Sequence, residues 1–278
     1  MKIVKRRIDF DFDPDAVPRA WYRGDLHLTT FWSSLSLLFP EGERFFVEAV
    51  RRFRDRITDP ELLAQIDAFV AQEAMHGKQH RAFNDMVRAR GMAVAEPAEQ
   101  QLRRLLGFAR RTLSPRGQLA VTCALEHFTA IMAEQLLAQE DHRDSGHESV
   151  RHLWVWHALE EAEHKAVAFD VYRAVGGTYG MRVGLMLVTS AIFFAEQLNV
   201  HARFLRAEGE LWNAAGWARA LGYFWVRPGL FRRLVPAYLD YFRPGFHPED
   251  RDTGALIAHW REALFGEAGE LREKLKAA

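Results

Sequence analysis

The chain has one cysteine, Cys123, among 278 residues, so no disulfide can form within it. This excludes the small disulfide-stabilised classes of protein and suits a reducing cytoplasm. Charge of one sign is also lacking, because Lys plus Arg and Asp plus Glu both number 37. A chain without net charge has no global field that attracts nucleic acid, so we expect no nucleic-acid partner.

Long hydrophobic runs are scarce. The longest, from Gly184 to Ala195, reads GLMLVTSAIFFA and has 12 residues, whereas a bilayer-spanning helix needs about 20. The chain starts with MKIVKRRIDFDFDPD, which is basic and then acidic and has no apolar stretch typical of a secretory signal. We therefore expect a cytoplasmic protein, with association at a membrane surface as a second possibility.

The two-residue alternation of apolar and polar side chains that marks β-strands is almost absent. After Gly24 the apolar residues recur at spacings of three and four, which is typical of helices. Cap residues and glycines predict helices over about 60–90, 115–141 and 145–175. Pro40 is expected to begin a new helix or to kink one.

No linker, repeat or low-complexity stretch divides the chain. We predict a single all-helical domain over 1–278. Its metal-binding four-helix core would cover about 25–176, and accessory helices about 180–275.

Two of the predicted helices carry ionisable residues on the stripe that should face the core. Steps of three and four along the first give the stripe Leu62, Ile66, Phe69, Glu73, His76, His80, Phe83 and Val87. The same steps along the second give Val150, Trp154, His157, Glu161, His164, Ala168 and Val171. Each stripe therefore has Glu-x-x-His at mid-length with apolar residues on both sides.

Buried carboxylates and imidazoles need partners, because an unpaired one costs several kcal/mol (~2–7). Two divalent metal ions suit such a mixture of oxygen and nitrogen donors. In ferritin-like bundles two helices give Glu-x-x-His and two others give one Glu each. Glu43 and Glu126 lie on apolar seams and supply the single glutamates. The predicted ligands are Glu43, Glu73, His76, Glu126, Glu161 and His164.

Several alternatives stay open at this stage. The paired motifs could lie on solvated surface helices. Glu41 and Glu48 compete with Glu43, and Glu160 and Glu163 lie beside Glu161. His80 and His157 share the faces of their motifs, so each is a candidate extra ligand, a residue that orients a ligand, or an ordinary core histidine.

At these residues the chain resembles a known family. The segments FPEGERFF, QEAMHGKQH, LEHFTA, WHALEEAEHKAVAFDVY and YFRPGFHPED are similar to those of the bacterial family called predicted metal-dependent hydrolases. The resemblance implies a ferritin-like helical fold. The His157-x-x-x-Glu161-x-x-His164 spacing also resembles that of di-iron arylamine N-oxygenases, which implies that His157 is a seventh ligand. His80 stays a candidate ligand or orienting residue.

The donor set favours a di-iron or mixed Mn/Fe oxygenase or oxidase that acts on a small apolar substrate with dioxygen. The first alternative is a two-metal hydrolase, as the family description states, using Mn or Zn. A non-catalytic metal-binding or membrane-associated protein is the second. No catalytic residue beyond the ligands, and no other cofactor, is indicated.

The region 181–246 is rich in Trp, Phe, Tyr and Arg. It could contact a membrane surface, or form an apolar tunnel to the metals. The simpler interpretation is a set of helices packed on the core with arginines at the rim. A homodimer interface is a further possibility.

Overall fold

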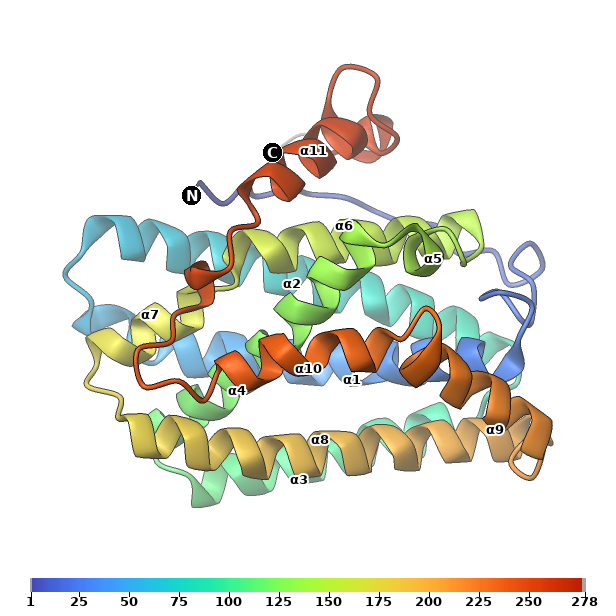
Figure 1. Ribbon diagram of the computed structural model, residues 1–278. Coiled ribbons are helices and arrows are strands. Elements are labelled where there is room, and N and C mark those ends of the chain that lie inside the picture. The colour runs from blue at the N-terminus through green and yellow to red at the C-terminus, as the bar shows by residue number, and fades with distance from the viewer. Residues whose placement is uncertain (1, 277–278) are drawn as a thin grey trace.

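The computed structural model describes residues 2–276, and these fold into helices joined by short connections (Figure 1). No β-strand occurs among them; two isolated bridges pair Ile8 with Leu275 and Tyr22 with Gly146. The predicted all-α class is therefore confirmed.

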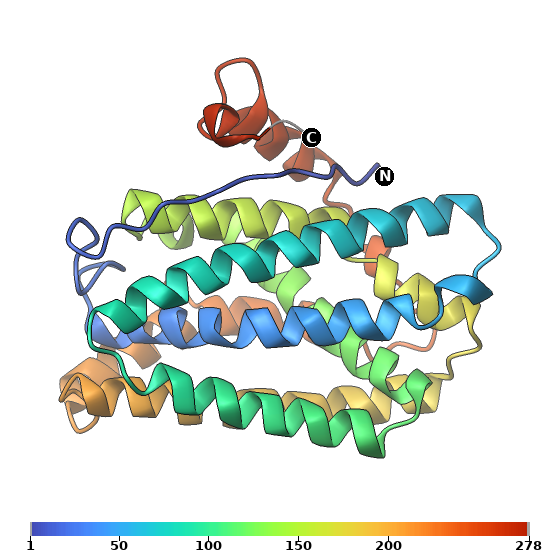
Figure 2. The ribbon, with the colours of Figure 1, turned by 180° about the vertical axis from the view of Figure 1, so that it is seen from behind.

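Four helices carry the predicted ligands. They are α1 (Leu26–Arg51), α2 (Pro60–Ala89), α4 (Pro115–Ala138) and α6 (Glu148–His164). Helix α1 packs on α2 and α4, and α6 packs on α2 and α4. Figures 1 and 2 show α1, α2 and α6 running lengthwise while α4 crosses the molecule obliquely.

Local sequence explains where these helices begin. The side chains of Asp25, Asp59 and Ser114 each accept a hydrogen bond from a backbone N–H of the first turn. Pro60 and Pro115 occupy first-turn positions, where their missing N–H has no helical partner to lose. Helix α2 ends one residue before the Arg90–Gly91 turn, and Gly91 takes the left-handed φ of 87°.

Two predicted boundaries differ from the structure. Helix α1 continues through Pro40, so no new helix begins there as one of our two expectations had it. The predicted helix over 145–175 is interrupted after His164 and resumes as α7 (Val167–Ala174). At the interruption Lys165 turns toward a neighbouring segment, and its Nζ donates to the carbonyl of Arg251 and to Thr253 Oγ1.

The predicted helix over 115–141 is also divided. After α4 a separate turn, α5 (Glu140–Arg143), precedes α6. A 3₁₀ turn, η1 (Arg54–Arg56), connects α1 to α2.

The remaining helices cover the outside of the four. Helices α3 (Ala95–Thr112) and α8 (Tyr179–Ala207) lie side by side along one edge, lowermost in Figures 1 and 2. Helix α8 leads to α9 (Ala214–Leu221), the π-helical turn η2 (Gly222–Val226) and α10 (Leu230–Asp240). Helix α11 (Gly254–Phe265), between the turns η3 (Pro248–Asp250) and η4 (Arg272–Lys274), lies near both termini on the opposite edge (Figure 1).

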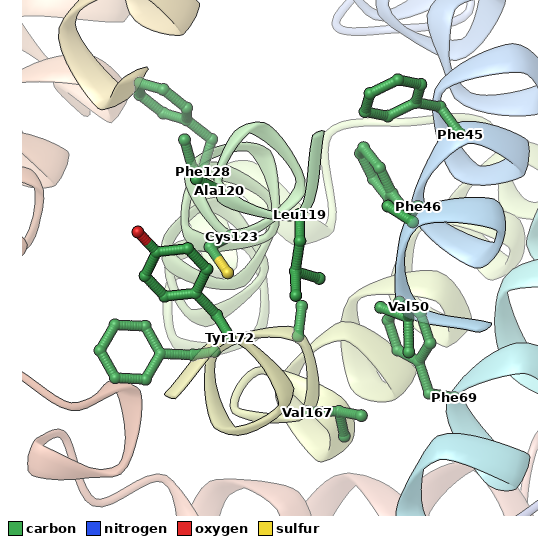
Figure 3. Packing of buried hydrophobic residues seen from close by; sticks show 14 of the residues in the cluster. Phe45, Phe46, Val50, Phe69, Leu119, Ala120, Cys123, Phe128, Val167 and Tyr172 are labelled. Atoms are coloured by element: carbon green, nitrogen blue, oxygen red, sulfur yellow. The ribbon is translucent and has the colours of Figure 1, made fainter. Parts of the chain in front are cut away.

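The core consists of two apolar clusters. One contains Phe46, Phe69, Leu119 and Tyr172, some of which Figure 3 shows converging from α1, α2, α4 and α7. The other contains residues such as Phe83, from the far part of α2. On α2 the last fully buried residue of the first cluster is Phe69, and the first fully buried residue of the second is Phe83. The ionisable residues of α2 therefore lie between two apolar clusters.

Candidate metal centre

The structure brings the predicted ligands into one buried space. Glu43 comes from α1, Glu73 and His76 from α2, Glu126 from α4, and His157, Glu161 and His164 from α6. All seven side chains are buried. Their donor atoms form overlapping groups of three close enough to share a metal ion, and Glu126 adjoins these groups through His164.

One half of the cluster gathers around His164. Its Nε2 lies 3.0 Å from Glu73 Oε1, 3.6 Å from Glu126 Oε2 and 3.6 Å from Glu161 Oε2. None of these four atoms makes a hydrogen bond within residues 2–276. Carboxylate oxygens that surround an imidazole nitrogen without hydrogen bonding to it are arranged as the ligands of a cation are.

The other half gathers around His157 and His76. His157 Nε2 lies 2.9 Å from Glu161 Oε1 and 3.8 Å from Glu43 Oε1. His76 Nδ1 lies 3.6 Å from the same Glu161 oxygen and 3.7 Å from Glu73 Oε1. Glu161 therefore presents one oxygen to each half of the cluster.

Many donor atoms of the cluster lack a protein partner. Buried atoms without a hydrogen bond are both carboxylate oxygens of Glu43, Glu73 and Glu126, Oε2 of Glu161, Nδ1 of His76 and Nε2 of His164. Each such atom costs about 1–3 kcal/mol when it is left unpaired. Cations coordinated by these atoms would remove that cost, so the donor set fits metal.

The electrostatics of the cluster also fit cations. Burial, together with the nearby charge of Glu73, raises the pKa of Glu43 and of Glu126 well above the ordinary value. Burial likewise raises the pKa of Glu73 to about 7. Against the effect of burial, the carboxylate of Glu161 raises the pKa of His164, and the pKa of Glu161 is lowered in return. Without a cation, burial therefore favours the protonated forms of Glu43, Glu73 and Glu126.

The outward-facing nitrogens of two histidines are held by a second layer of polar residues. His76 Nε2 bonds Glu160 Oε2 at 3.2 Å, and His164 Nδ1 bonds Gln72 Oε1 at 2.8 Å. Arg6 connects these two hydrogen-bonded pairs. Its guanidinium donates to Glu160, the partner of His76, and to Glu163. Glu163 also accepts from Gln72, the partner of His164. Such outer bonds fix the ring orientation and tautomer of metal-binding histidines.

His157 is held by a chain of hydrogen bonds through His80. Asn84 Nδ2 donates to the Ser36 carbonyl, so Asn84 Oδ1 must be the atom that accepts from Ser36 Oγ at 2.8 Å. Ser36 Oγ then accepts from His80 Nδ1 at 2.7 Å, and neutral His80 accepts at Nε2 from His157 Nδ1 at 2.6 Å. The direction of every bond follows from the amide of Asn84. With Nδ1 engaged by His80, Nε2 is the nitrogen of His157 that faces the cluster, where it is hydrogen-bonded to Glu161 Oε1 at 2.9 Å.

His80 lies within reach of Glu43 and His157, as a third ligand would. Both of its ring nitrogens are already engaged, one by Ser36 and one by His157. This geometry fits the orienting role that we considered for His80 better than the role of ligand.

Pro40 explains why the Ser36 carbonyl is available. In α1 that carbonyl would accept from the backbone N–H four residues later, and proline has none. Asn84 Nδ2 takes the place of that donor at 3.2 Å. The proline inside the helix therefore supplies the acceptor that orients the chain to His157.

The competing glutamates have other partners. Glu41 pairs with Arg44, and Glu48 pairs with Arg110 near the surface. Glu163 pairs with Arg6 and Arg261. Among the candidate acids and their neighbours, Glu43 and Glu161 lie in the cluster. Glu160 lies outside it and bonds the outward-facing nitrogen of His76.

A cavity of about 270 Å³ leads to the cluster. Glu43, His157 and Glu161 line it, together with apolar residues of α1, α3, α4, α6 and α8. Its lining includes Phe108 of α3 and Ile192 of α8, both of which are exposed, so the cavity opens between these helices. An apolar substrate could thus reach the metal-facing carboxylates from the α3/α8 edge.

Sequence reasoning missed the residues that support the cluster. Arg6, Ser36, Gln72 and Asn84 lie far apart in sequence and carry no periodic signal of their own. Gln72 and Asn84 are buried amides on α2. Amides that directly adjoin the apolar stripe, as Gln72 adjoins Glu73 and Asn84 adjoins Phe83, are the one local signal that could have indicated them.

Fold and site together define an all-helical protein with a buried cluster of Glu and His side chains suited to metal. The chain belongs to the family described as predicted metal-dependent hydrolase, whose model matches residues 4–252. No match to the chain was found among curated proteins or among solved structures. Family and cluster both indicate a metal-dependent protein.

Proposed function

We propose that the cluster binds two divalent metal ions inside a ferritin-like four-helix core made of α1, α2, α4 and α6. Helices α2 and α6 each offer Glu-x-x-His, and α1 and α4 each offer one glutamate, which is the ligand pattern of such bundles. The core would cover about 25–176 of a single domain, with about 180–275 as accessory helices. The proposed ligands are Glu43, Glu73, His76, Glu126, His157, Glu161 and His164, with His80 orienting His157.

The charge of this set suits two divalent ions, because four carboxylates offset four positive charges. Oxygen and imidazole donors bind Mn, Fe and Zn alike, so the donor set does not distinguish them. We propose Mn or Zn for a hydrolytic reaction and an iron pair for a reaction with dioxygen.

We infer that the enzyme hydrolyses an ester or amide of an apolar substrate. The single observation that carries this inference is the cavity, which connects an apolar opening to Glu43, His157 and Glu161. Metal ions held there would act as Lewis acids on the substrate carbonyl and would lower the pKa of bound water. In the reaction the oxygen of water bonds to the acyl carbon, the bond to the leaving oxygen or nitrogen breaks, and the leaving group departs with a proton.

The protein's own side chains position the substrate and exclude bulk water. The aliphatic and aromatic lining from α3, α4 and α8 would hold the hydrocarbon part. Glu196 of α8 also lines the cavity. Its Oε2 accepts from Gln101, while its buried Oε1 has no hydrogen-bond partner in the part of the chain that the structure describes. That oxygen could accept a hydrogen bond from a donor group of the substrate, which would fix the substrate's orientation.

A second candidate function is oxidation of the apolar substrate by dioxygen at a di-iron centre. The same cavity favours it, since an apolar wall limits the access of water to a redox-active site. The three histidines facing the cluster are compatible with iron.

One experiment separates these functions. Metal-free protein is loaded with Mn(II), Zn(II) or anaerobic Fe(II), and assayed with p-nitrophenyl esters of increasing acyl length. Hydrolysis should require metal, accelerate with acyl length and disappear in Glu161→Ala. Glu73→Ala and Glu161→Ala should lose metal, whereas Glu48→Ala, a glutamate of α1 near the surface, should bind it normally.

The contrary outcomes are equally clear. A rapid ferric absorbance after oxygen is admitted, with no ester cleavage under Mn or Zn, would favour the oxidase. Normal metal content in both Glu73→Ala and Glu161→Ala would refute the metal centre itself.

A further inference from the structure

Helix α8 exposes a wholly apolar face over four turns. The exposed residues between positions 184 and 198 are Gly184, Leu187, Val188, Ala191, Ile192, Phe194, Ala195 and Leu198. No polar or charged side chain interrupts them. Leu187 and Leu198 are each 56% exposed. Contiguous apolar surface of this kind marks a contact with a membrane or another protein.

The neighbouring edge helix, α3, adds positive charge beside this face. Arg104, Phe108 and Arg111 follow each other at steps of four and three, so they share one side of α3, and all three are exposed. Neither arginine makes an ion pair within residues 2–276. Between Glu99 and Glu126 the chain has five arginines and no acidic residue. This edge is therefore apolar along α8 and cationic along α3.

The opposite side of α8 decides how the helix could meet a membrane. By length and composition α8 is the one helix within the described residues that could cross a bilayer, although its longest uninterrupted apolar run is short. Yet it packs against α1 and α4, and it buries the polar side chains of Glu196 and Gln197 against the core. Lipid cannot surround α8 while these contacts persist. An orientation in the plane of the membrane exposes only its apolar face to lipid.

Exposed aromatic residues continue the apolar face toward the C-terminal helices. Phe194 of α8 contacts Phe231 of α10, with ring centroids 6.2 Å apart, and Trp225 of η2 contacts the same ring at 5.9 Å. Tyr179, at the other end of α8, is also exposed. Tyrosine and tryptophan are enriched where proteins meet the interface between lipid and water.

A second copy of this chain suits the edge less well than lipid does. In a two-fold dimer the same patch lies on both partners, so Arg104 and Arg111 would approach a surface that carries the same charges. Within the described residues α8 exposes no acidic side chain, and α3 exposes one, Glu96, on its first turn and about two turns before Arg104. Anionic lipid headgroups supply the missing negative charge.

We propose that the α3/α8 edge docks on a bilayer containing anionic lipids, with the apolar face of α8 inserted among the acyl chains and Arg104 and Arg111 at the headgroups. The cavity opens between the same two helices. A membrane-dissolved substrate with an acyl or similar hydrocarbon chain would therefore enter directly from the bilayer. This assignment of substrate class rests on the proposed function, whereas the docking itself does not.

Flotation of the full-length protein with vesicles of equal parts of phosphatidylcholine and phosphatidylglycerol tests the docking surface. Wild-type protein should float with the vesicles. Ala191→Glu places a charge in the centre of the apolar face and should abolish flotation. The matched control is Ala64→Glu, which puts the same charge at an exposed position of α2 and should float as wild type does.

The charge contribution is tested in the same assay. Arg104→Gln with Arg111→Gln should weaken binding to the vesicles about thirtyfold, from roughly fivefold for each arginine. The matched pair Arg51→Gln with Arg52→Gln removes two exposed charges at the end of α1 and should leave binding unchanged. Vesicles of phosphatidylcholine alone should bind the wild-type protein weakly.

Contrary results overturn the proposal. Wild-type protein that does not float, or Ala191→Glu that floats as well as Ala64→Glu, would exclude this edge as a lipid surface. A lipid-free dimer that Ala191→Glu dissociates, in a protein that binds no vesicles, would assign the face to a second copy. Because flotation needs no turnover, failure of the hydrolytic assay leaves this result intact, and the reverse also holds.

Discussion

Gly77 of α2 allows α1 to approach the cluster. A Cβ at this position would lie 3.2 Å from Glu43 Oε2 and 3.7 Å from the Cα of Pro40. Gly77→Ala should therefore displace the Glu43 carboxylate and lower metal affinity at least tenfold, as measured by competition with a chelator. Glycine to alanine within a helix otherwise stabilises by roughly 0.5–1 kcal/mol. We expect the metal-free variant to be no less stable than wild type.

The control for this change is Gly184→Ala in α8, where nothing lies within 4 Å of the added Cβ. It should gain the same helical stability and bind metal as wild type does. Equal metal affinities for the two variants would show that the close approach at Gly77 does not matter to the site.

Ser36 is the central member of the chain that directs His157. Ser36→Ala removes both the donor to Asn84 and the acceptor for His80, so the imidazole of His157 loses its fixed tautomer. Loss of such outer partners typically costs 10–100-fold in metal affinity. We expect a loss of about this size for one of the two metal ions, measured by calorimetric titration, with the other ion retained.

Ser34→Ala provides the comparison. Ser34 is buried in the same helix and donates to the carbonyl of Phe31, away from the cluster. Its removal should cost stability but leave both metal affinities unchanged. A Ser36→Ala protein that binds metal as Ser34→Ala does would rule out the orienting chain.

The sequence could predict those site residues that interrupt a helical apolar stripe. Glu73 and His76 do so on α2, and their burial between apolar neighbours follows from spacing alone. The sequence could not predict Arg6 or Ser36, because their contacts with the cluster depend on where a distant helix or segment packs. Helical spacing favoured Glu161 over the adjacent Glu160, but it did not show that Glu160 is also buried on α6 and bonds His76 from outside the cluster.

The N-terminal segment packs along the α2 and α6 side of the molecule, and it contributes to the site through one residue (Figure 2). Arg6 is buried between Glu160 and Glu163, at 3.0 and 2.7 Å. Removal of one member of a buried ion pair costs about 3–5 kcal/mol, because the other charges stay buried. Arg6→Met should therefore lower the free energy of unfolding by about that amount in chemical denaturation.

Arg7→Met tests whether this loss is specific. Arg7 is the next residue in the same segment, its side chain is exposed, and it makes no ion pair within the described residues. Its replacement should change stability by less than about 0.5 kcal/mol. Similar losses in the two variants would mean that the segment contributes by covering the helices and not through the buried pair.

Helix boundaries were predictable where a cap or proline acts locally and not where tertiary contacts act. Asp59 with Pro60 and Ser114 with Pro115 begin α2 and α4 as expected. Pro40 does not end α1, because Asn84 of the next helix satisfies the carbonyl that the proline leaves free. No property of the sequence around position 40 shows that partner.

At the scale of the whole molecule, the cluster of Glu and His side chains lies between two apolar clusters. Ionised carboxylates buried there without partners would destabilise the fold. Protonation reduces this buried negative charge, since burial raises the pKa of Glu43, Glu73 and Glu126. In the unfolded chain these carboxyl groups ionise near their ordinary values, around pH 4.3. Bound cations would replace the protons. Metal and pH should therefore act on stability through the same groups.

The direction of the pH effect follows from proton counts. Above about pH 7.5 the histidines of the unfolded chain are nearly all neutral. The buried histidines whose pKa is lowered, such as His76, His80 and His201, then no longer make stability rise with pH. In that range the folded, metal-free protein holds more protons than the unfolded chain, because the folded pKa values of Glu43, Glu126 and His164 are raised and that of Glu73 is about 7. Stability must then fall as pH rises.

Thermal or urea unfolding of the metal-free protein between about pH 7.5 and 8.5 should show this loss, at about 1 kcal/mol per pH unit for each proton held only by the folded state. With Mn(II) or Zn(II) present the slope should reverse, because deprotonated ligands bind metal more tightly as pH rises. Glu126→Gln removes one of the titrating carboxyl groups, so it should flatten the metal-free slope. A metal-free protein whose stability is constant over this range, or whose slope metal does not change, would show that the cluster is not the place where protons and cations compete.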